Sequence, residues 1–172
     1  MTIGEVNAVL YFVVIGAAAL WAAIVALGLL FPARVRRSEA ALLEKPGRLL
    51  ANGVAIGVLG AGAGIALLNA PNGLVKLFGW LLISGIALLS TLGAAGLARV
   101  VAGRIGQLDL GQSEFTALWR GAGLLVLAGL FPAFGWFLLF PLQLFAGIGA
   151  GMAALGKNRG ESAAAIRAEP LG

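Results

Sequence analysis

The 172-residue chain has no cysteine and no histidine. Without cysteine it can form no disulfide, no thiolate nucleophile and no cysteine-ligated iron–sulfur cluster. Without histidine it lacks the commonest metal ligand and the side chain that titrates most readily near neutral pH. Charged residues are also scarce, at 11% of the chain. Little acid–base or nucleophilic chemistry is left, so we expect a protein that is not an enzyme and has no catalytic residues, metal or cofactor.

Hydrophobic residues are abundant instead. They make up 60% of the chain, and the mean hydropathy is +1.01, which a water-soluble domain of this size could not bury in one core. Three uncharged stretches, at 6–33, 49–75 and 77–98, each reach the roughly 20 residues that a membrane helix needs. The first is interpreted as a mature helix, because no Lys or Arg precedes it and it is longer than the apolar part of a signal peptide.

A fourth uncharged run covers residues 121–156 and contains two prolines. As one continuous helix it would be about 54 Å long, against a hydrocarbon core of roughly 30 Å. Proline interrupts a helix because it lacks an N–H group and its ring clashes with the preceding turn. We therefore predict a helical hairpin whose turn involves Pro132, Gly135, Trp136 and Pro141; the alternative is one tilted, kinked helix. The expected fold is an all-α polytopic bundle with three full spans plus this hairpin, four to five membrane helices in all.

The basic residues predict the orientation. Under the positive-inside rule the segment 32–48 is a cytoplasmic loop, and the loop 99–120 is cytoplasmic too. The basic surface of the first loop comprises Arg34, Arg36, Arg37, Lys45 and Arg48. A hairpin at 121–156 places eleven of the twelve Lys and Arg residues on the inner side, whereas a single crossing leaves four outside. We therefore expect a multi-pass protein of the inner (plasma) membrane with its N-terminus outside and its C-terminus cytoplasmic.

Glycine is the second structural signal, with 27 residues. Three pairs have the small-xxx-small spacing that lets membrane helices approach closely: Gly53 with Gly57, Gly60 with Gly64, and Gly147 with Gly151. Two interpretations stay open, a docking face for another protein and internal packing of this chain's own helices. The glycine-rich stretch 57–64 is no phosphate loop, because it lacks the Lys and Ser/Thr of that motif.

No ionisable residue lies within an expected span, so no intramembrane site is indicated. The hydroxyl and amide groups of the spans are expected to bond within their own helices. Gln143 is the exception: it follows Pro141 by two residues, where either a freed backbone carbonyl accepts its amide or a cofactor or solute binds. The seven acidic residues show no metal-ligand spacing and are interpreted as solvated loop charges or helix N-terminal charges, and Ser113 is a candidate N-cap. Residues 1–156 thus form one membrane domain, followed by a polar tail at 157–172 that is expected to be disordered.

A resemblance rests on the order of five segments: FPARVRR, EKPGRLLANG, ARVVAGRIG, WRGAGLLVLAGLFPAFGW and GIGAGMAAL. Over residues 8–156 the chain resembles the multi-helix membrane domain of some bacterial proteins that carry bactofilin-like, polymer-forming segments. No polymer-forming β-helical part is found in these 172 residues. The resemblance implies a bacterial inner-membrane setting and adds no catalytic residues.

Our first functional hypothesis is a non-enzymatic scaffold, anchor or accessory subunit. Its partners would be membrane lipids and other membrane proteins or copies of itself. The alternative is a small transporter or channel built around the proline-broken hairpin, since discontinuous helices line the binding sites of many transporters. The net charge of +5 is explained by positive-inside loops and does not indicate nucleic-acid binding.

Overall fold

The computed structural model describes residues 3–106 and 113–156, and all regular structure in these two ranges is helical. The elements are α1 (Ile3–Leu30), α2 (Pro32–Glu44), α3 (Pro46–Leu68), α4 (Gly73–Gly106), α5 (Glu114–Leu130), the π-helical segment η1 (Gly135–Leu139) and α6 (Phe140–Leu155). Four segments are long and apolar enough to cross a membrane: Gly4–Leu30, Pro46–Leu68, Gly73–Ile105 and Gly135–Leu155. The predicted helical membrane fold, with the last hydrophobic run broken near Pro132, is confirmed. The predicted tail at 157–172 lies outside the described residues.

Both predicted loops are largely helical: 32–48 holds α2 and the start of α3, and 99–120 includes the end of α4 at Gly106 and the start of α5 at Glu114. Pro32 occupies the first turn of α2, where its missing N–H group does no harm, and the chain stays helical to Glu44. Pro46 then starts α3 in the same way. Lys45 precedes Pro46 and has a φ of −142°, outside the helical region. It therefore separates the two helices. The basic surface is therefore carried mainly on a short helix whose buried residues are Val35 and Ser38.

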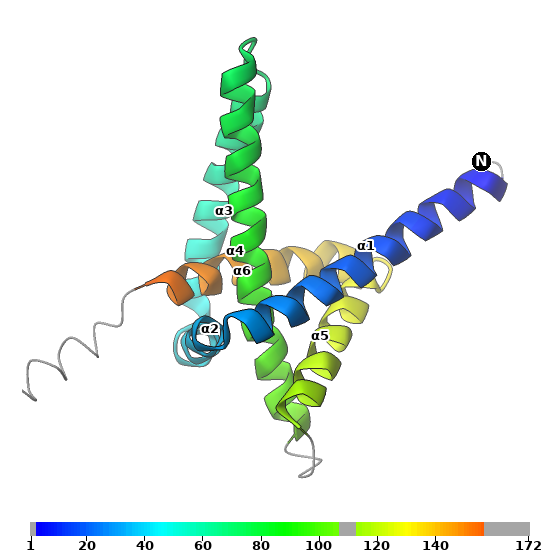
Figure 1. Cartoon of the computed structure of the whole chain (residues 1–172), viewed down its shortest axis with the longest axis vertical. Coiled ribbons are helices and arrows are strands. Elements are labelled where there is room, and N and C mark those ends of the chain that lie inside the picture. Colours follow the sequence, from blue (N-terminus) through cyan, green and yellow to red (C-terminus); the bar gives the residue numbers. More distant parts are fainter. Residues whose placement is uncertain (1–2, 107–112, 157–172) are drawn as a thin grey trace, which may run out of the picture.

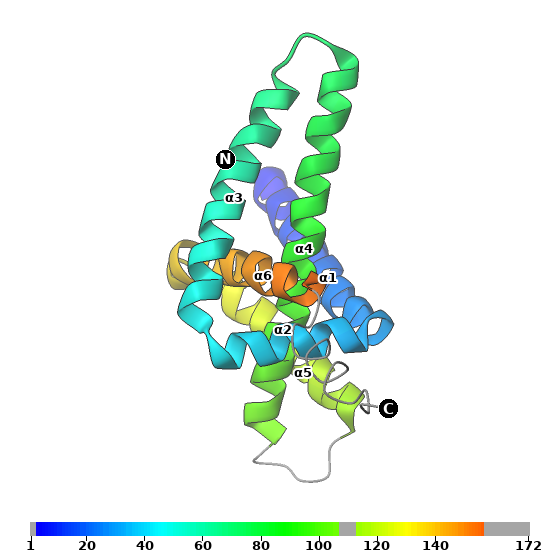
Figure 2. The same cartoon turned by 90° about the vertical axis from the view of Figure 1, so that its left-hand side faces the viewer.

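Helices α3 and α4 form an antiparallel pair, and α6 runs across both of them (Figures 1 and 2). The pair packs directly in its half nearest the connecting turn, where Ile83 and Ile86 of α4 fill the space beside Gly64 and Gly60 of α3. Further down, the two helices diverge and α6 contacts each of them (Figure 2). The first half of α3 and the middle of α4 thus form the seat of α6.

Glycines bring α6 into direct backbone contact with its seat. A Cβ on Gly53 would overlap the carbonyl oxygen of Phe145, and one on Gly93 would overlap that of Gly147. From the other side, side chains at Gly149 and Gly151 would overlap the carbonyls of Leu49 and Leu89. No residue larger than glycine fits these four positions without moving a backbone. Ser90 adds a cross-helix hydrogen bond, since its hydroxyl donates to the carbonyl of Leu144 at 3.4 Å, rather than to its own helix as expected.

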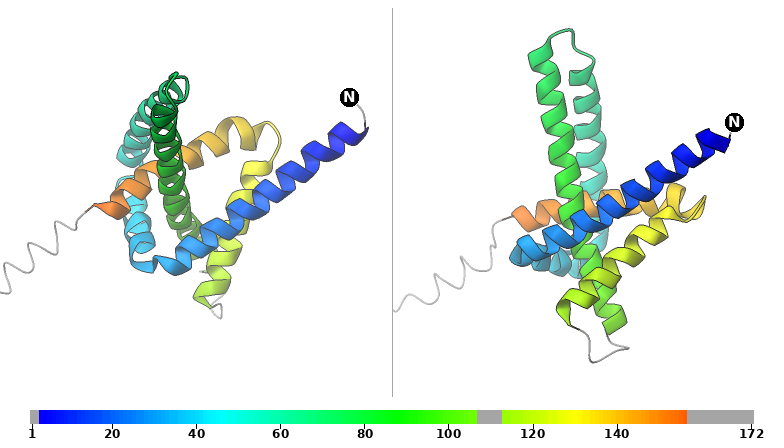
Figure 3. Two further views of the ribbon diagram at one scale, coloured as in Figure 1. Left: turned by 45° about the horizontal axis from the view of Figure 1, so that its top comes forward. Right: turned by 45° about the vertical axis from the view of Figure 1, so that its right-hand side comes forward.

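The remaining helices dock by similar means. Gly96 of α4 leaves room for the buried Ser38 of α2, and Gly121 of α5 lies against the carbonyl of Ala98. Helix α1 is joined to α5 by an aromatic pair: the rings of Trp21 and Trp119 are 4.5 Å apart, and the Trp21 indole N–H donates to the Trp119 carbonyl at 3.1 Å. These contacts involve only the second half of α1. Its first half projects away from the other helices (Figures 1 and 3).

We expect Gly93→Ala to destabilise the protein by about 1–3 kcal/mol, because the added methyl group overlaps the Gly147 backbone and forces α4 and α6 apart. Gly85→Ala is the matched control on the same helix, where a Cβ meets nothing within 4 Å. It should leave stability unchanged or raise it, since alanine is the better helix former. Thermal unfolding of the purified protein in detergent measures both. Equal unfolding temperatures for wild type and Gly93→Ala would contradict the contact.

Candidate functional site

The turn that reverses the chain lies between α5 and η1. Helix α5 ends at Leu130, and the Phe134 N–H donates to the Pro132 carbonyl at 2.8 Å. Ala133 has a φ of 63°, in the left-handed region that L-residues seldom adopt. Gly135 then packs on the end of α5, where a Cβ would lie 2.6 Å from the Ala128 carbonyl oxygen. Pro132 and Gly135 therefore have the predicted role in the turn.

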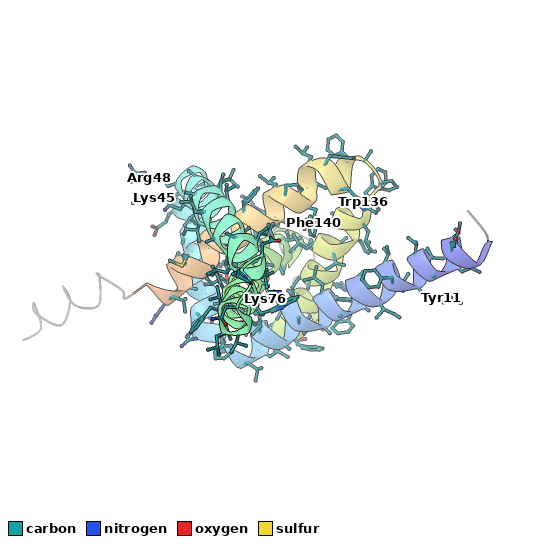
Figure 4. The ribbon with its side chains drawn as sticks, turned by 90° about the horizontal axis from the view of Figure 1, so that it is seen from above. Tyr11, Lys45, Arg48, Lys76, Trp136 and Phe140 are labelled. Carbon is teal, nitrogen blue, oxygen red and sulfur yellow. The ribbon has the colours of Figure 1, made fainter. Side chains whose placement is uncertain are left out.

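Pro141 does not break the helix, contrary to expectation. It lies in the first turn of α6, where no N–H group is needed, and the residues before it form the wider π-helical turn η1. In η1 the Phe140 N–H donates to the Gly135 carbonyl, five residues back. Such π-turns accommodate a residue that an α-helix cannot. Trp136 lies on the outer side of this segment with 57% of its surface exposed, near Phe140 (Figure 4).

Gln143 joins the two arms of the hairpin. Its side-chain amide donates to the Leu125 carbonyl of α5 at 3.1 Å, so its partner belongs to the opposite arm and is not a carbonyl freed by Pro141. Two apolar cavities lie on either side of it. One, of about 580 Å³, is an open cavity lined by α1, α5, η1 and α6, and its lining includes Phe12 and Trp136. The other, of about 460 Å³, lies among α3, α4, α5 and α6 and includes Leu97. Gln143 lines both.

The predicted packing glycines all lie at contacts within the chain. Gly53 and Gly57 contact Phe145 of α6, Gly60 and Gly64 contact α4, and Gly147 and Gly151 contact the α4 backbone at Ser90 and Leu89. The internal-packing interpretation of these residues therefore accounts for every one of the three pairs. None of the six offers a free surface to another protein.

The five residues of the predicted basic surface are not one cluster. Arg34, Arg36 and Arg37 lie near the start of α2, whereas Lys45 and Arg48 lie together where α2 meets α3 (Figure 4). Arg34 and Lys45 are eleven positions apart in the sequence, which corresponds to about 16 Å of helix. Two separate basic groups thus occupy opposite ends of α2.

An ion-pair cluster that the sequence did not predict connects three helices. Arg99 of α4 contacts Glu39 of α2 at 3.0 Å and Glu114 of α5 at 2.5 Å, and Arg36 lies 3.7 Å from Glu114. Arg99 is largely buried, with 17% of its side chain exposed. The hydrogen bond from Arg99 and then the charges of Arg99 and Arg36 lower the pKa of the Glu114 carboxyl. Glu39 and Glu114 are therefore not merely solvated charges, and the predicted cap is present, since the Thr116 N–H donates to Ser113 Oγ at 3.3 Å.

No sequence pattern indicates this cluster, because its members lie 15 and 60 residues apart along the chain. The residues that the structure describes include no group of three or more acidic residues placed to hold a metal ion. No protein-family model, no curated protein and no solved structure matches this chain.

The lowered pKa of Glu114 predicts a loss of stability in acid. A carboxyl whose pKa is lower in the folded than in the unfolded protein stabilises the fold above its ordinary pKa of about 4.3, and this contribution is lost as the pH falls through the folded-state value. We expect Glu114→Gln to lower the unfolding temperature at pH 7 and to flatten the decline below pH 4. Glu44→Gln is the control, since Glu44 has no partner among the described residues. Identical pH profiles for the two variants would refute the role of Glu114.

Proposed function

We propose that the chain is a non-enzymatic scaffold, anchor or accessory subunit of a bacterial inner membrane. The observation that supports this best is the contrast between its two parts. Backbone contacts at glycines hold the central helices together, whereas most of the first half of α1 is an apolar surface that the described residues leave exposed. Phe12 is 81% exposed, and Val9, Tyr11 and Ile15 are each more than half exposed. A rigid body with one projecting apolar helix is suited to holding another membrane protein.

The docking face in this proposal is the exposed half of α1, residues 4–15. Membrane helices associate through close van der Waals contact, and α1 continues here into Gly16 and three alanines, which would let a partner helix approach. A Cβ on Gly16 would meet nothing within 4 Å, so its surface is free, unlike the glycines of α3 and α6. The partner is another membrane protein or a second copy of the chain.

The proposed orientation has the N-terminus outside and the C-terminus in the cytoplasm. The Arg99 cluster requires water nearby and fixes the start of α5 at the basic end of α4. From Glu114 to Leu130, α5 is about 25 Å long even when upright, less than the roughly 30 Å of hydrocarbon. The turn at 131–134 would then lie within the membrane as the tip of a re-entrant hairpin. The last turns of α6 pack near α2, which carries the basic residues. Both ends of the hairpin therefore belong to one side.

A small transporter or channel remains the second candidate. The two cavities beside Gln143 favour it, because they lie at the broken hairpin where a transporter would bind its substrate. Liposome uptake assays with the purified protein separate the two functions. Solute flux above that of empty liposomes would favour transport over scaffolding.

Site-specific photo-crosslinking tests the docking face. We expect a photoreactive residue in place of Phe12 or Ile15 to give discrete protein adducts in native membranes. The same residue in place of Leu59, which is 73% exposed on α3, should crosslink mainly to lipid. Mass spectrometry of the adducts distinguishes a foreign partner from a second copy. Equal adduct patterns at all three positions would remove α1 as the docking face.

A reporter of compartment tests the orientation. Alkaline phosphatase, which is active only outside the cytoplasm, is expected to be inactive when fused after Gly172 and active when inserted in the α3–α4 turn at 70–72. Both results follow from the basic residues at the inner ends of the helices. Phosphatase activity at Gly172 would show that the last hydrophobic run crosses the membrane once, against the re-entrant hairpin.

A further inference from the structure

Arg34 differs from the other arginines of its helix. Arg36 pairs with Glu114, whereas the Arg34 guanidinium has no carboxylate partner among the described residues. It lies instead over the ring of Phe31, with 5.1 Å between Cζ and the ring centroid. An arginine is charged at any physiological pH and binds phosphate through two parallel hydrogen bonds. Arg34 is therefore an exposed cation available to an anion.

Arg34 also lies at the rim of an apolar groove. The groove has a volume of about 230 Å³ between the end of α1, the middle of α4 and the end of α6. Its walls come from Leu27 and Phe31, from Leu88, Leu89 and Leu92, and from Leu155. Arg34 supplies its charge. The volume is below the roughly 300–1,000 Å³ of pockets that enclose a whole drug-sized molecule, so the groove suits a length of hydrocarbon chain.

The groove opens between helices that are long and apolar enough to lie in a bilayer. Leu88 and Leu155 are more than half exposed, and both belong to helices long and apolar enough to cross the bilayer. Arg34 follows the last residue of α1 by four positions, at the level where the apolar span gives way to headgroups. It also lies in the first turn of α2, where the positive end of the helix dipole adds to the attraction for an anion.

We propose that this groove is a binding site for one anionic phospholipid. The phosphate binds the guanidinium of Arg34, and one acyl chain lies in the groove against Leu88 and Leu155. An acidic peptide would satisfy the arginine but would leave the leucine walls exposed to lipid. A zwitterionic lipid would fill the groove but would bring its own cation close to Arg34. The site goes beyond the general attraction of basic loops for anionic membranes, because it distinguishes Arg34 from its neighbours.

Titration of the delipidated protein with lipids, read by native mass spectrometry, tests the site. Phosphatidylglycerol and phosphatidylcholine with the same acyl chains are the probes, in an uncharged detergent. We expect one phosphatidylglycerol to bind about tenfold more tightly than phosphatidylcholine, as charge-assisted hydrogen bonds predict. Arg34→Gln should remove most of this preference, and Arg34→Lys should keep part of it.

Two further variants separate the site from diffuse attraction. Arg48→Gln removes the same charge from an exposed position outside the groove and should change the affinity by less than about twofold. Leu88→Trp keeps every charge, fills the groove and should weaken phosphatidylglycerol binding. Circular dichroism and gel filtration check that each variant is folded.

The proposal is overturned by any of three results. Equal losses of phosphatidylglycerol affinity in Arg34→Gln and Arg48→Gln would mean that binding depends only on the net charge of the protein. Unchanged binding in folded Leu88→Trp would mean that no acyl chain occupies the groove. Competition by glycerol phosphate as strong as that by the intact lipid would indicate a site for a free anion.

Discussion

The contact between the backbone of α6 and the backbones of α3 and α4 is the constraint on which the other helices depend. In a bilayer, helices gain nothing by leaving lipid tails for one another's side chains, so attraction comes from close packing and from polar backbone groups. At Gly53, Gly93, Gly149 and Gly151 the nearest atom to a hypothetical Cβ is a carbonyl oxygen of the facing helix. A glycine hydrogen occupies that direction instead. This recurring geometry is that of Cα–H···O contacts, each contributing roughly 0.5–1 kcal/mol.

The close approach also determines what the interior contains. Where backbones touch, only small side chains fit between helices, and the buried residues include five alanines of α4, α5 and α6 with no exposed surface or almost none: Ala95, Ala98, Ala122, Ala150 and Ala154. The largest fully buried side chains are Ile24, Ile148 and Val35. Because α6 lies across the seat, α5 must leave α4 to reach the turn, and this opens the cavities on both sides of Gln143. The cavities are thus a consequence of the crossing.

The amino-acid sequence predicts the parts of this fold that depend on local chemistry. Uncharged length predicts the spans, and the missing N–H group of Pro132 predicts the turn. The charged residues of α2 favour a loop under the positive-inside rule, although Pro32 and Pro46 mark the starts of consecutive helices. The crossing of α6 and the Arg99 cluster could not be predicted, because both depend on which distant segments meet. Glycine spacing predicts that a close contact exists without naming the helix on the other side, and nothing near Glu39 points to Arg99, 60 residues away.

The same packing bears on the choice between scaffold and transporter. Alternating access requires two helix arrangements of similar energy. Helix α6 has little room to slide on α3 and α4, because at four glycine positions even a methyl group would overlap the facing backbone. The elements with freedom to move are at the edge: the α5 arm, held to α6 by the Gln143 amide, and α1, held by the tryptophan pair. A solute path would have to open there, along the wall of the larger cavity. The α1 residues of that wall adjoin the projecting half of α1. A partner bound to α1 would therefore cover the opening of the cavity. If α1 is the docking face that we propose, a bound partner and a solute path would compete for one surface, and the exposed Tyr11 and Phe12 favour the partner.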